Sequence, residues 1–294
     1  MAKMGGMRLI AYRLAALLPL AAVFALAAAC AGEPADPIPP PASDEDAVSA
    51  IPAPAPTPEP PPLPDLPAGR VPGIDVSHHQ AGVDWPAVAG SGVHFVYVKA
   101  TEGIDYQDPS FDAAWQALGE AGLLRGAYHM YRPEDSPAEQ AEWFLSVVRD
   151  AGSGPRDLPP ALDVERVSST DSVPREELAA GAVAWLRQVE AELGRTPLLY
   201  TNPSFWVEKL EEDHELTEFP LWLAEYTDEE PGPLELGWEE WTLWQHSQSG
   251  EEPGIPKAVD LNVAASRETL LGLLEGAAAV AAPEAADGSS AVER

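Results

Sequence analysis

Short apolar and β-branched runs recur along the chain between positions 70 and 275. Runs of this length, bounded by glycine, proline and polar residues, are typical of strands. Eight of them occur, at Gly73–Ser77, Val93–Ala100, Arg125–Tyr131, Pro160–Glu165, Pro197–Thr201, Pro220–Tyr226, Trp241–His246 and Val259–Val263.

Apolar residues at helical spacing separate the earlier strands and predict five helices. These helices cover Asp84–Ala89, Pro109–Glu120, a segment that opens at Ser136, Pro174–Leu193 and Pro203–Leu210. Loops rich in Gly, Pro and Glu join the last three strands instead. The order of elements predicts an α/β fold, a single irregular (β/α) barrel of about eight strands and five helices whose last three strands lack helices.

The first 30 residues have the pattern of an export signal. They carry three basic residues and no acid, followed by an apolar run from Leu14 to Ala29. That run is shorter than the roughly 20 residues that a membrane-spanning helix needs. Small residues precede Cys30, so we predict a lipoprotein signal peptide over residues 1–30, with lipidation of Cys30. An ordinary cleaved secretion signal is the alternative. Either signal predicts export, to the bacterial cell envelope if the chain is lipid-anchored and to the outside of the cell if it is secreted.

Residues 31–69 and 276–294 lack the composition of a folded domain. The first segment has 14 prolines, seven acids and no aromatic residue, so burial of apolar surface cannot offset the entropy of ordering it. We predict a disordered, proline-rich acidic linker there and a disordered tail at the C-terminus. All nine tryptophans lie in residues 70–275, which we predict to form one domain.

Charge and cysteine content exclude several classes of protein. The chain has 17 basic and 48 acidic residues, a net charge of −31, which argues against binding to nucleic acid. Its single cysteine excludes an intrachain disulfide framework and a cysteine-rich metal site. We also expect a monomer, in contact with the membrane only through the predicted lipid anchor.

Carboxylates follow several of the predicted strands. In an α/β barrel the reactive groups gather where strands end and loops begin. Asp75, Glu102 and Asp260 lie at the ends of the first, second and eighth strands, and Asp163 and Glu165 lie at the end of the fourth. The sequence therefore predicts an acidic site at one edge of the barrel.

Asp163 and Glu165 are the pair among these acids that we expect to lie closest together. Residues two apart on a strand project from the same face, with Cα atoms about 6–7 Å apart. Repulsion between two carboxylates and partial burial both favour one member keeping its proton. We assign the role of proton donor to Glu165.

Seven short motifs, in order, resemble those of the family 25 glycoside hydrolases, the lysozymes that act as N-acetylmuramidases. They are Asp75-Val76-Ser77-His78, Val98-Lys99-Ala100-Thr101-Glu102-Gly103, Gly126-Ala127-Tyr128-His129, Asp163-Val164-Glu165, Tyr200-Thr201, Trp244-Gln245 and Asp260-Leu261-Asn262. The resemblance covers about residues 73–270. It implies a flattened barrel of eight strands and five helices, Glu165 as general acid, Asp163 as its partner, and Asp75 and Asp260 as further acids of the groove.

A glycan substrate calls for flat apolar surfaces beside hydrogen-bonding groups. The substrate-binding candidates lie in or near the strands and the matched motifs, and they are Tyr128, Tyr131, Tyr200, Trp222, Tyr226, Trp244, Glu102 and His129. No histidine spacing typical of a metal site accompanies them. We therefore expect neither a metal nor another cofactor.

The resemblance implies hydrolysis of the β-1,4 bond between N-acetylmuramic acid and N-acetylglucosamine in peptidoglycan strands. Asp163 shares a face with Glu165 and is poorly placed to attack the sugar from the opposite side, so we favour attack by the substrate's own acetamido group, assisted by Asp163. An inverting route with Asp163 or Asp260 as base stays open. A catalytically inactive module that binds wall glycans and a chitinase-like glycosidase are the alternative functions.

Overall fold

The computed structural model describes residues 63–210, 215–227, 229–232 and 236–276, all within the compact unit Pro60–Arg294. The predicted signal peptide with Cys30 lies outside these residues, as do most of the predicted linker and tail. Within the described ranges, no helix has the length and apolar character needed to cross a bilayer.

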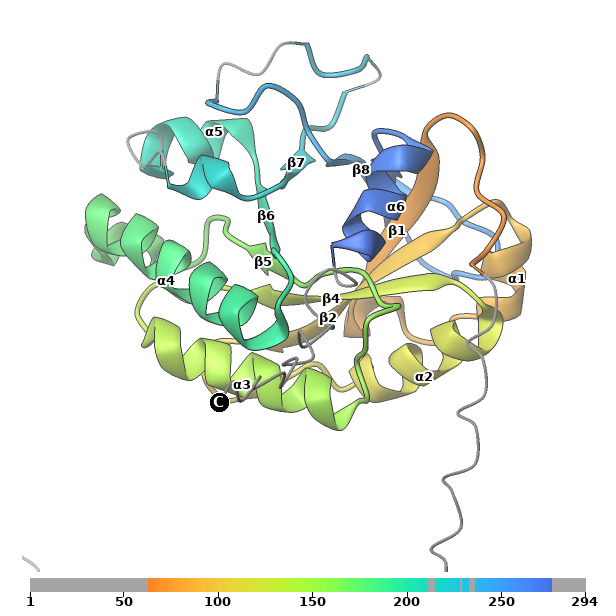
Figure 1. Cartoon of the computed structure of the whole chain (residues 1–294), viewed down its shortest axis with the longest axis horizontal. Helices are drawn as coiled ribbons and strands as arrows, with labels where there is room; N and C mark the ends of the chain where they lie inside the picture. The colour runs from red at the N-terminus through yellow and green to blue at the C-terminus, as the bar shows by residue number, and fades with distance from the viewer. Residues whose placement is uncertain (1–62, 211–214, 228, 233–235, 277–294) are drawn as a thin grey trace, which may run out of the picture. The chain divides into compact units, whose positions relative to one another are not determined.

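One sheet closes on itself to form the barrel (Figure 1). Strand β1 pairs with both β2 and β9, which closes a ring of eight strands, and the short β3 pairs with β2 outside the ring. The strands are β1 (Val71–Val76), β2 (Phe95–Glu102), β3 (Tyr106–Gln107), β4 (Leu124–Met130), β5 (Ala161–Asp163), β6 (Leu198–Thr201), β7 (Leu221–Ala224), β8 (Leu243–Gly250) and β9 (Val259–Ala264). Each predicted strand matches one member of the ring, which confirms the predicted barrel.

The last strand of the ring reverses direction. From β1 through β8 the neighbouring strands of the ring run parallel, whereas β9 is antiparallel to both β8 and β1. Asp260 therefore lies near the beginning of its strand, not at the end of a parallel strand as the sequence analysis supposed. Because an antiparallel strand begins where its parallel neighbours end, Asp260 still lies at the predicted edge of the barrel.

Six α-helices occur in the described residues. They are α1 (Trp85–Gly90), α2 (Phe111–Ala121), α3 (Pro137–Asp150), α4 (Arg175–Leu193), α5 (Pro203–Phe205) and α6 (Arg267–Glu275). The capping residues act locally as expected, since the Ser136 side chain accepts a hydrogen bond from the backbone of Glu139. Helix α5 continues into one π-helical turn, Trp206–Leu210, and α6 follows β9 as an addition to the five predicted helices.

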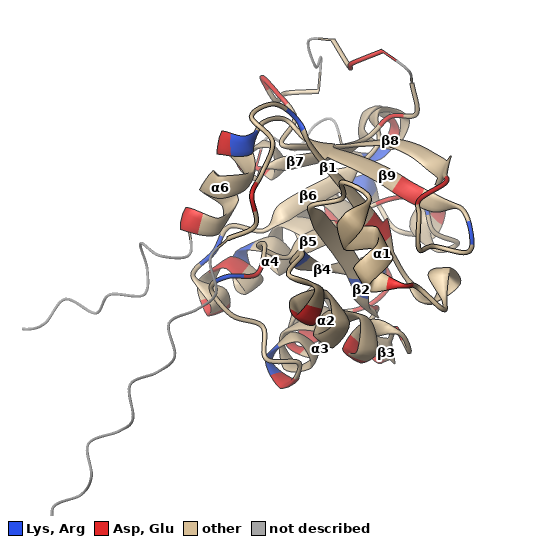
Figure 2. Ribbon diagram, turned by 90° about the vertical axis from the view of Figure 1, so that its right-hand side faces the viewer, with Lys and Arg blue, Asp and Glu red and all other residues tan. Residues whose placement is uncertain are grey.

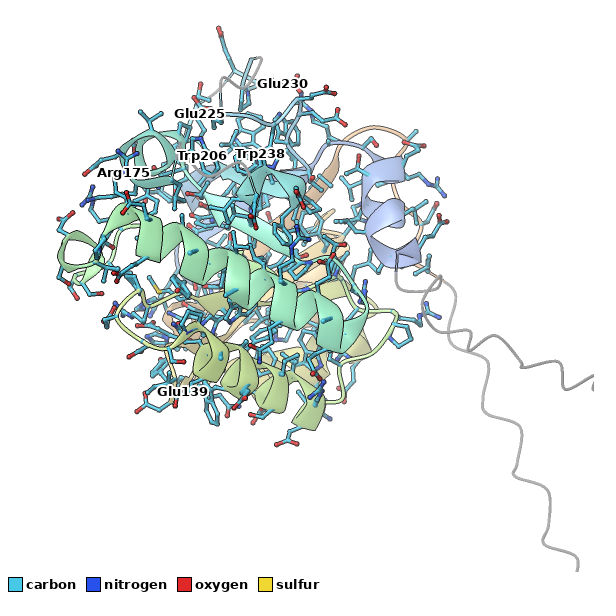
Figure 3. All side chains as sticks on the ribbon, turned by 60° about the vertical axis from the view of Figure 1, so that its left-hand side comes forward. Glu139, Arg175, Trp206, Glu225, Glu230 and Trp238 are labelled. Carbon is cyan, nitrogen blue, oxygen red and sulfur yellow. The ribbon has the colours of Figure 1, made fainter. Side chains whose placement is uncertain are left out.

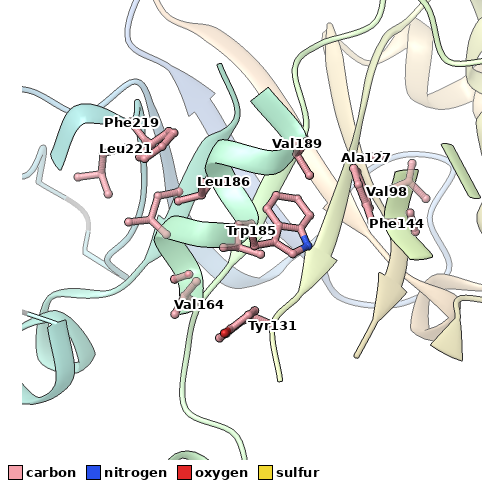
Figure 4. Close-up of a cluster of buried hydrophobic side chains, with 14 of the residues drawn as sticks. Val98, Ala127, Tyr131, Phe144, Val164, Trp185, Leu186, Val189, Phe219 and Leu221 are labelled. Carbon is pink, nitrogen blue, oxygen red and sulfur yellow. The ribbon is translucent and has the colours of Figure 1, made fainter. Parts of the chain in front are cut away.

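Two hydrophobic clusters lie on opposite faces of the sheet. The larger one packs α1 to α4 against the outer face of the strands, and Figure 4 shows its centre around Trp185, Phe144 and Val98. The smaller one combines the inner faces of the strands with Leu270 and Leu274 of α6. Alternation along each strand therefore separates helix-facing residues from barrel-interior residues.

Packing and charge outside the barrel edge are ordinary for a globular protein. In Figure 3, Trp206 and Trp238 lie together beside α5, with ring centroids 4.5 Å apart, and the indole N–H of Trp238 donates to the carbonyl of Phe219 at 2.8 Å. Acidic residues are spread over several elements in Figure 2, and most of those in the described ranges are exposed. The acid excess is therefore mostly a solvated surface.

Candidate active site

The alternation of side chains along and just beyond β5 directs Asp163 and Glu165 into the barrel mouth. Leu162 and Val164 belong to the helix-facing cluster, so Asp163 and Glu165 point to the opposite, inner face. The backbone N–H of Val164 still bonds the carbonyl of Tyr200 at 2.9 Å, which extends the ladder beyond β5 and holds Glu165 in this alternation.

Asp75 and Asp260 complete a cluster of four carboxylates. They lie opposite one another in the β1–β9 register, and the charges of both act on Asp163. The structure therefore brings the four predicted acids together from three strands at one edge of the barrel.

Asp75 is held by a buried network of side-chain amides. Its Oδ2 accepts hydrogen bonds from Gln245 and Asn262, both at 2.7 Å. Gln245 in turn accepts from the hydroxyls of Tyr200 and Tyr226, both at 2.9 Å. These bonds fix the orientation of Asp75 before any ligand binds.

Burial and mutual repulsion raise the pKa values of these acids. For Asp75, burial and then the charge of Asp260 raise the pKa well above its usual range, against the lowering effect of its amide partners. Burial also raises the pKa of Asp260. An acid cluster of this kind keeps protons at a pH where an exposed carboxyl would have lost them.

Asp163 differs from Asp75 because one of its carboxylate oxygens accepts no hydrogen bond from the described residues. Its Oδ1 is buried and has no hydrogen-bond partner among the described residues. Burial, and then the charge of Glu165, raise the pKa of Asp163 well above its usual range. Buried polar atoms are rarely left unpaired, so this oxygen marks a position where a ligand donor would be stabilised.

The positive charge of Lys99 acts on Glu165. Burial raises the pKa of Glu165, the charge of Lys99 lowers it, and the charge of Asp260 raises it again. Lys99 donates to Glu102 at 2.5 Å, and Arg132 pairs with the other oxygen of Glu102. Glu102, a predicted substrate-binding residue, therefore has both oxygens engaged in ion pairs, while Glu165 is half-buried and has no ion pair among the described residues.

Three of the predicted substrate-binding residues lie on the wrong face of the sheet. Tyr131 and Trp244 belong to the helix-facing cluster, and His129 stacks on Trp185 of α4 with ring centroids 5.3 Å apart. Their fractional exposures are 3%, 4% and 0%, which leaves little or no surface for a sugar. Burial and the outward direction of these side chains correct the expectation that they line a groove.

The remaining aromatic candidates face the barrel interior to different depths. Trp222 is 2% exposed, and its indole N–H donates to Asn262 at 2.7 Å. Tyr200 is also buried, Tyr128 is half-buried, and Tyr226 is exposed. Trp222 and Tyr200 thus hydrogen-bond the amides that hold Asp75, whereas Tyr226 and Tyr128 retain exposed surface for a ligand.

Four residues at the site were not among the predicted ones: Lys99, Gln245, Asn262 and Tyr106, whose ring centroid lies 5.7 Å from Lys99 Nζ. Asn262 could have been found from its spacing, because it lies two positions after Asp260 and so shares its face. Gln245 and Lys99 follow the same alternation on β8 and β2. Tyr106 lies in the hairpin after Glu102, where no local pattern indicates its orientation.

A barrel with paired carboxylates at the carboxyl edge of its strands has the groups that glycoside hydrolysis requires. Residues 74–255 match the family model described as glycosyl hydrolases family 25, and the chain belongs to that family. The resemblance seen in the sequence motifs is thereby confirmed, and the protein is an enzyme of the glycoside hydrolase class.

Relatives whose names state an activity agree with this assignment. Lysozyme M1 of Streptomyces globisporus is 32% identical over 197 residues, which are 65% of this chain and 67% of the relative. The N,O-diacetylmuramidase of a Chalaropsis species is 34% identical over 188 residues, 61% of this chain and 89% of the relative. The solved bacterial lysozyme of Streptomyces coelicolor matches with a TM-score of 0.65 and 32% identity, over 70% of this chain and 98% of that one.

Proposed function

We propose that this enzyme hydrolyses the β-1,4 bond between N-acetylmuramic acid and N-acetylglucosamine in peptidoglycan, with Glu165 as general acid and Asp163 as its partner. Relatives named lysozyme and muramidase support the substrate class. The observation that carries the assignment of residues is the unpartnered, buried Oδ1 of Asp163 beside Glu165.

In the first step, Glu165 gives its proton to the glycosidic oxygen as the bond to the anomeric carbon breaks. The carbonyl oxygen of the 2-acetamido group attacks that carbon and forms a cyclic oxazolinium. Asp163 Oδ1 accepts the acetamido N–H and stabilises the positive charge that develops on the ring. The raised pKa of Glu165 keeps its proton available for this transfer.

In the second step, water adds to the anomeric carbon and opens the oxazolinium. The carboxylate of Glu165 takes the proton of this water, which restores the enzyme and the acetamido group. Asp75 and Asp260 line the site beside this pair, and Tyr128 and Tyr226 supply aromatic surface for the sugars. The predicted signal of residues 1–30 would carry the enzyme to this substrate.

Digestion of purified peptidoglycan by the full chain tests the reaction. Borohydride reduction followed by mass spectrometry identifies the sugar at each new reducing end, and we expect N-acetylmuramic acid. Glu165→Gln should lower the rate by about 10²–10⁴-fold, and Asp163→Asn should lower it by about 10²–10³-fold.

The same carboxyl-to-amide change at exposed Glu120 of α2 is the matched control and should leave the rate unchanged. N-acetylglucosamine at the new reducing ends would contradict the proposed bond. Glycan binding without any release of reducing ends would identify an inactive binding module instead.

A further inference from the structure

A buried carboxylate, Asp108, lies between β3 and α2, apart from the four acids already described. Asp108 is 1% exposed. Its Oδ2 accepts from the backbone N–H of His78 at 3.1 Å and from His78 Nδ1 at 2.7 Å. Its Oδ1 accepts from the backbone N–H and the hydroxyl of Ser110 at 2.9 and 2.6 Å. Both carboxylate oxygens are therefore engaged.

These hydrogen bonds determine which nitrogen of His78 carries the proton. Burial by itself would raise the pKa of Asp108, but the hydrogen bonds from Ser110 and His78 lower it. Asp108 is therefore ionised at neutral pH and acts only as an acceptor, which places the proton of a neutral His78 on Nδ1. Nε2 is left as an acceptor, and the side chain of His78 is 38% exposed.

His78 follows β1 three residues after Asp75 and lies at the same edge of the barrel. Tyr106 stands beside it, with ring centroids 6.4 Å apart and a T-shaped arrangement. Tyr106 is 37% exposed, and its ring centroid lies 5.7 Å from Lys99 Nζ. Because the charges of Asp163 and Glu165 both act on Lys99, the surface formed by His78 and Tyr106 adjoins the acid cluster.

The imidazole of His78 is thus held by a buried carboxylate, and its partly exposed side chain lies beside an aromatic ring, an arrangement that can bind a ligand. We propose that His78 and Tyr106 form a subsite for one uncharged sugar unit of the glycan strand. His78 Nε2 accepts a hydrogen bond from a sugar hydroxyl or acetamido N–H, and the Tyr106 ring packs on the apolar face of the sugar. Asp108 positions His78, and the inference rests on the proposed glycan substrate.

His78→Asn separates this role from a purely structural one. The Asn side-chain amide can still donate to Asp108 from the position of Nδ1, but it has no atom at the position of Nε2. We expect the KM for a soluble peptidoglycan tetrasaccharide to rise about three- to tenfold, the effect of one neutral hydrogen bond, with kcat unchanged. The same substitution at half-buried His94, just before β2 at the opposite end of the barrel, is the matched control and should leave KM unchanged.

Tyr106→Ala should raise KM to a similar extent, whereas Tyr106→Phe should not, because the ring provides the contact. Affinity is also measured by calorimetry in the Glu165→Gln background, and the thermal midpoint of each variant reports folding. A His78→Asn variant with wild-type KM and affinity would overturn the subsite, as would a loss confined to kcat. If the wild type releases no reducing ends, the proposed function fails, and the relative affinities still decide the subsite.

Discussion

His129 should make the folded protein sensitive to acid, although its ring never meets solvent. Its Nδ1 lies 2.7 Å from the hydroxyl of Thr101, and its Nε2 lies 3.0 Å from Oε1 of Gln140. The amide nitrogen of Gln140 already donates to the carbonyl of Arg132, so Oε1 is the acceptor and Nε2 carries the proton. Burial lowers the pKa of His129 to about 3.

The size of the effect follows from this shift. In the unfolded chain a histidine has a pKa of about 6.5, so between pH 6.5 and 3 the unfolded state binds a proton that the folded state does not. Stability therefore falls as the pH is lowered through this range. At about 1.36 kcal/mol per pH unit, His129 alone should cost about 2 kcal/mol between pH 7 and pH 5.

Urea unfolding at pH 7 and pH 5, for the wild type and His129→Asn, measures this difference. The Asn side chain keeps an acceptor for Thr101 but does not titrate. The variant is less stable at pH 7 because it loses ring packing, yet it should lose about 2 kcal/mol less than the wild type on going to pH 5. The contributions of the carboxylates are common to both proteins and cancel.

Equal losses in the two proteins would show that His129 is not held neutral and would refute this reasoning. The KM for glycan provides a second check. Because His129 is fully buried, the folded variant should bind substrate as the wild type does, and a raised KM would favour the original expectation of a substrate contact.

Three further predictions concern the site and the core. Asp163→Asn should raise the free energy of unfolding at pH 7, because burial and a neighbouring charge raise the pKa of Asp163. The gain should vanish in acid, where the wild-type carboxyl is also neutral. Urea unfolding that shows the same gain at pH 7 and pH 4 would contradict this. Asn262→Leu removes the acceptor of the Trp222 indole N–H and one of the two amide donors to Asp75. It should cost about 1–3 kcal/mol in urea unfolding, and an unchanged midpoint would show that water replaces the amide. Gly181→Ala would place a methyl group against the Tyr131 hydroxyl and should lower the free energy of unfolding by about 1–3 kcal/mol. In a double-mutant cycle, Tyr131→Phe should restore part of this loss. Additive effects of the two substitutions would count against the clash.

Local patterns were sufficient for the elements and for the central pair of acids. The eight barrel strands, five of the helices and the shared face of Asp163 and Glu165 all depend on side-chain periodicity, which neighbouring residues specify. Helix α6 was missed because its short apolar stripe, Leu270 and Leu274, precedes a segment without a pattern.

Only the tertiary structure decided how the site is assembled. The direction of β9, which places Asp260 near the start of its strand, depends on pairing with β1 and β8. Gln245 and Asn262 hold Asp75 across 170 and 187 residues of sequence. Likewise, the face on which His129 lies depends on where α4 packs. The sequence by itself specified each strand and its periodicity, because these are properties of adjacent residues; which strand ends meet, and which of their side chains are buried, are long-range properties that exist only once the barrel has closed.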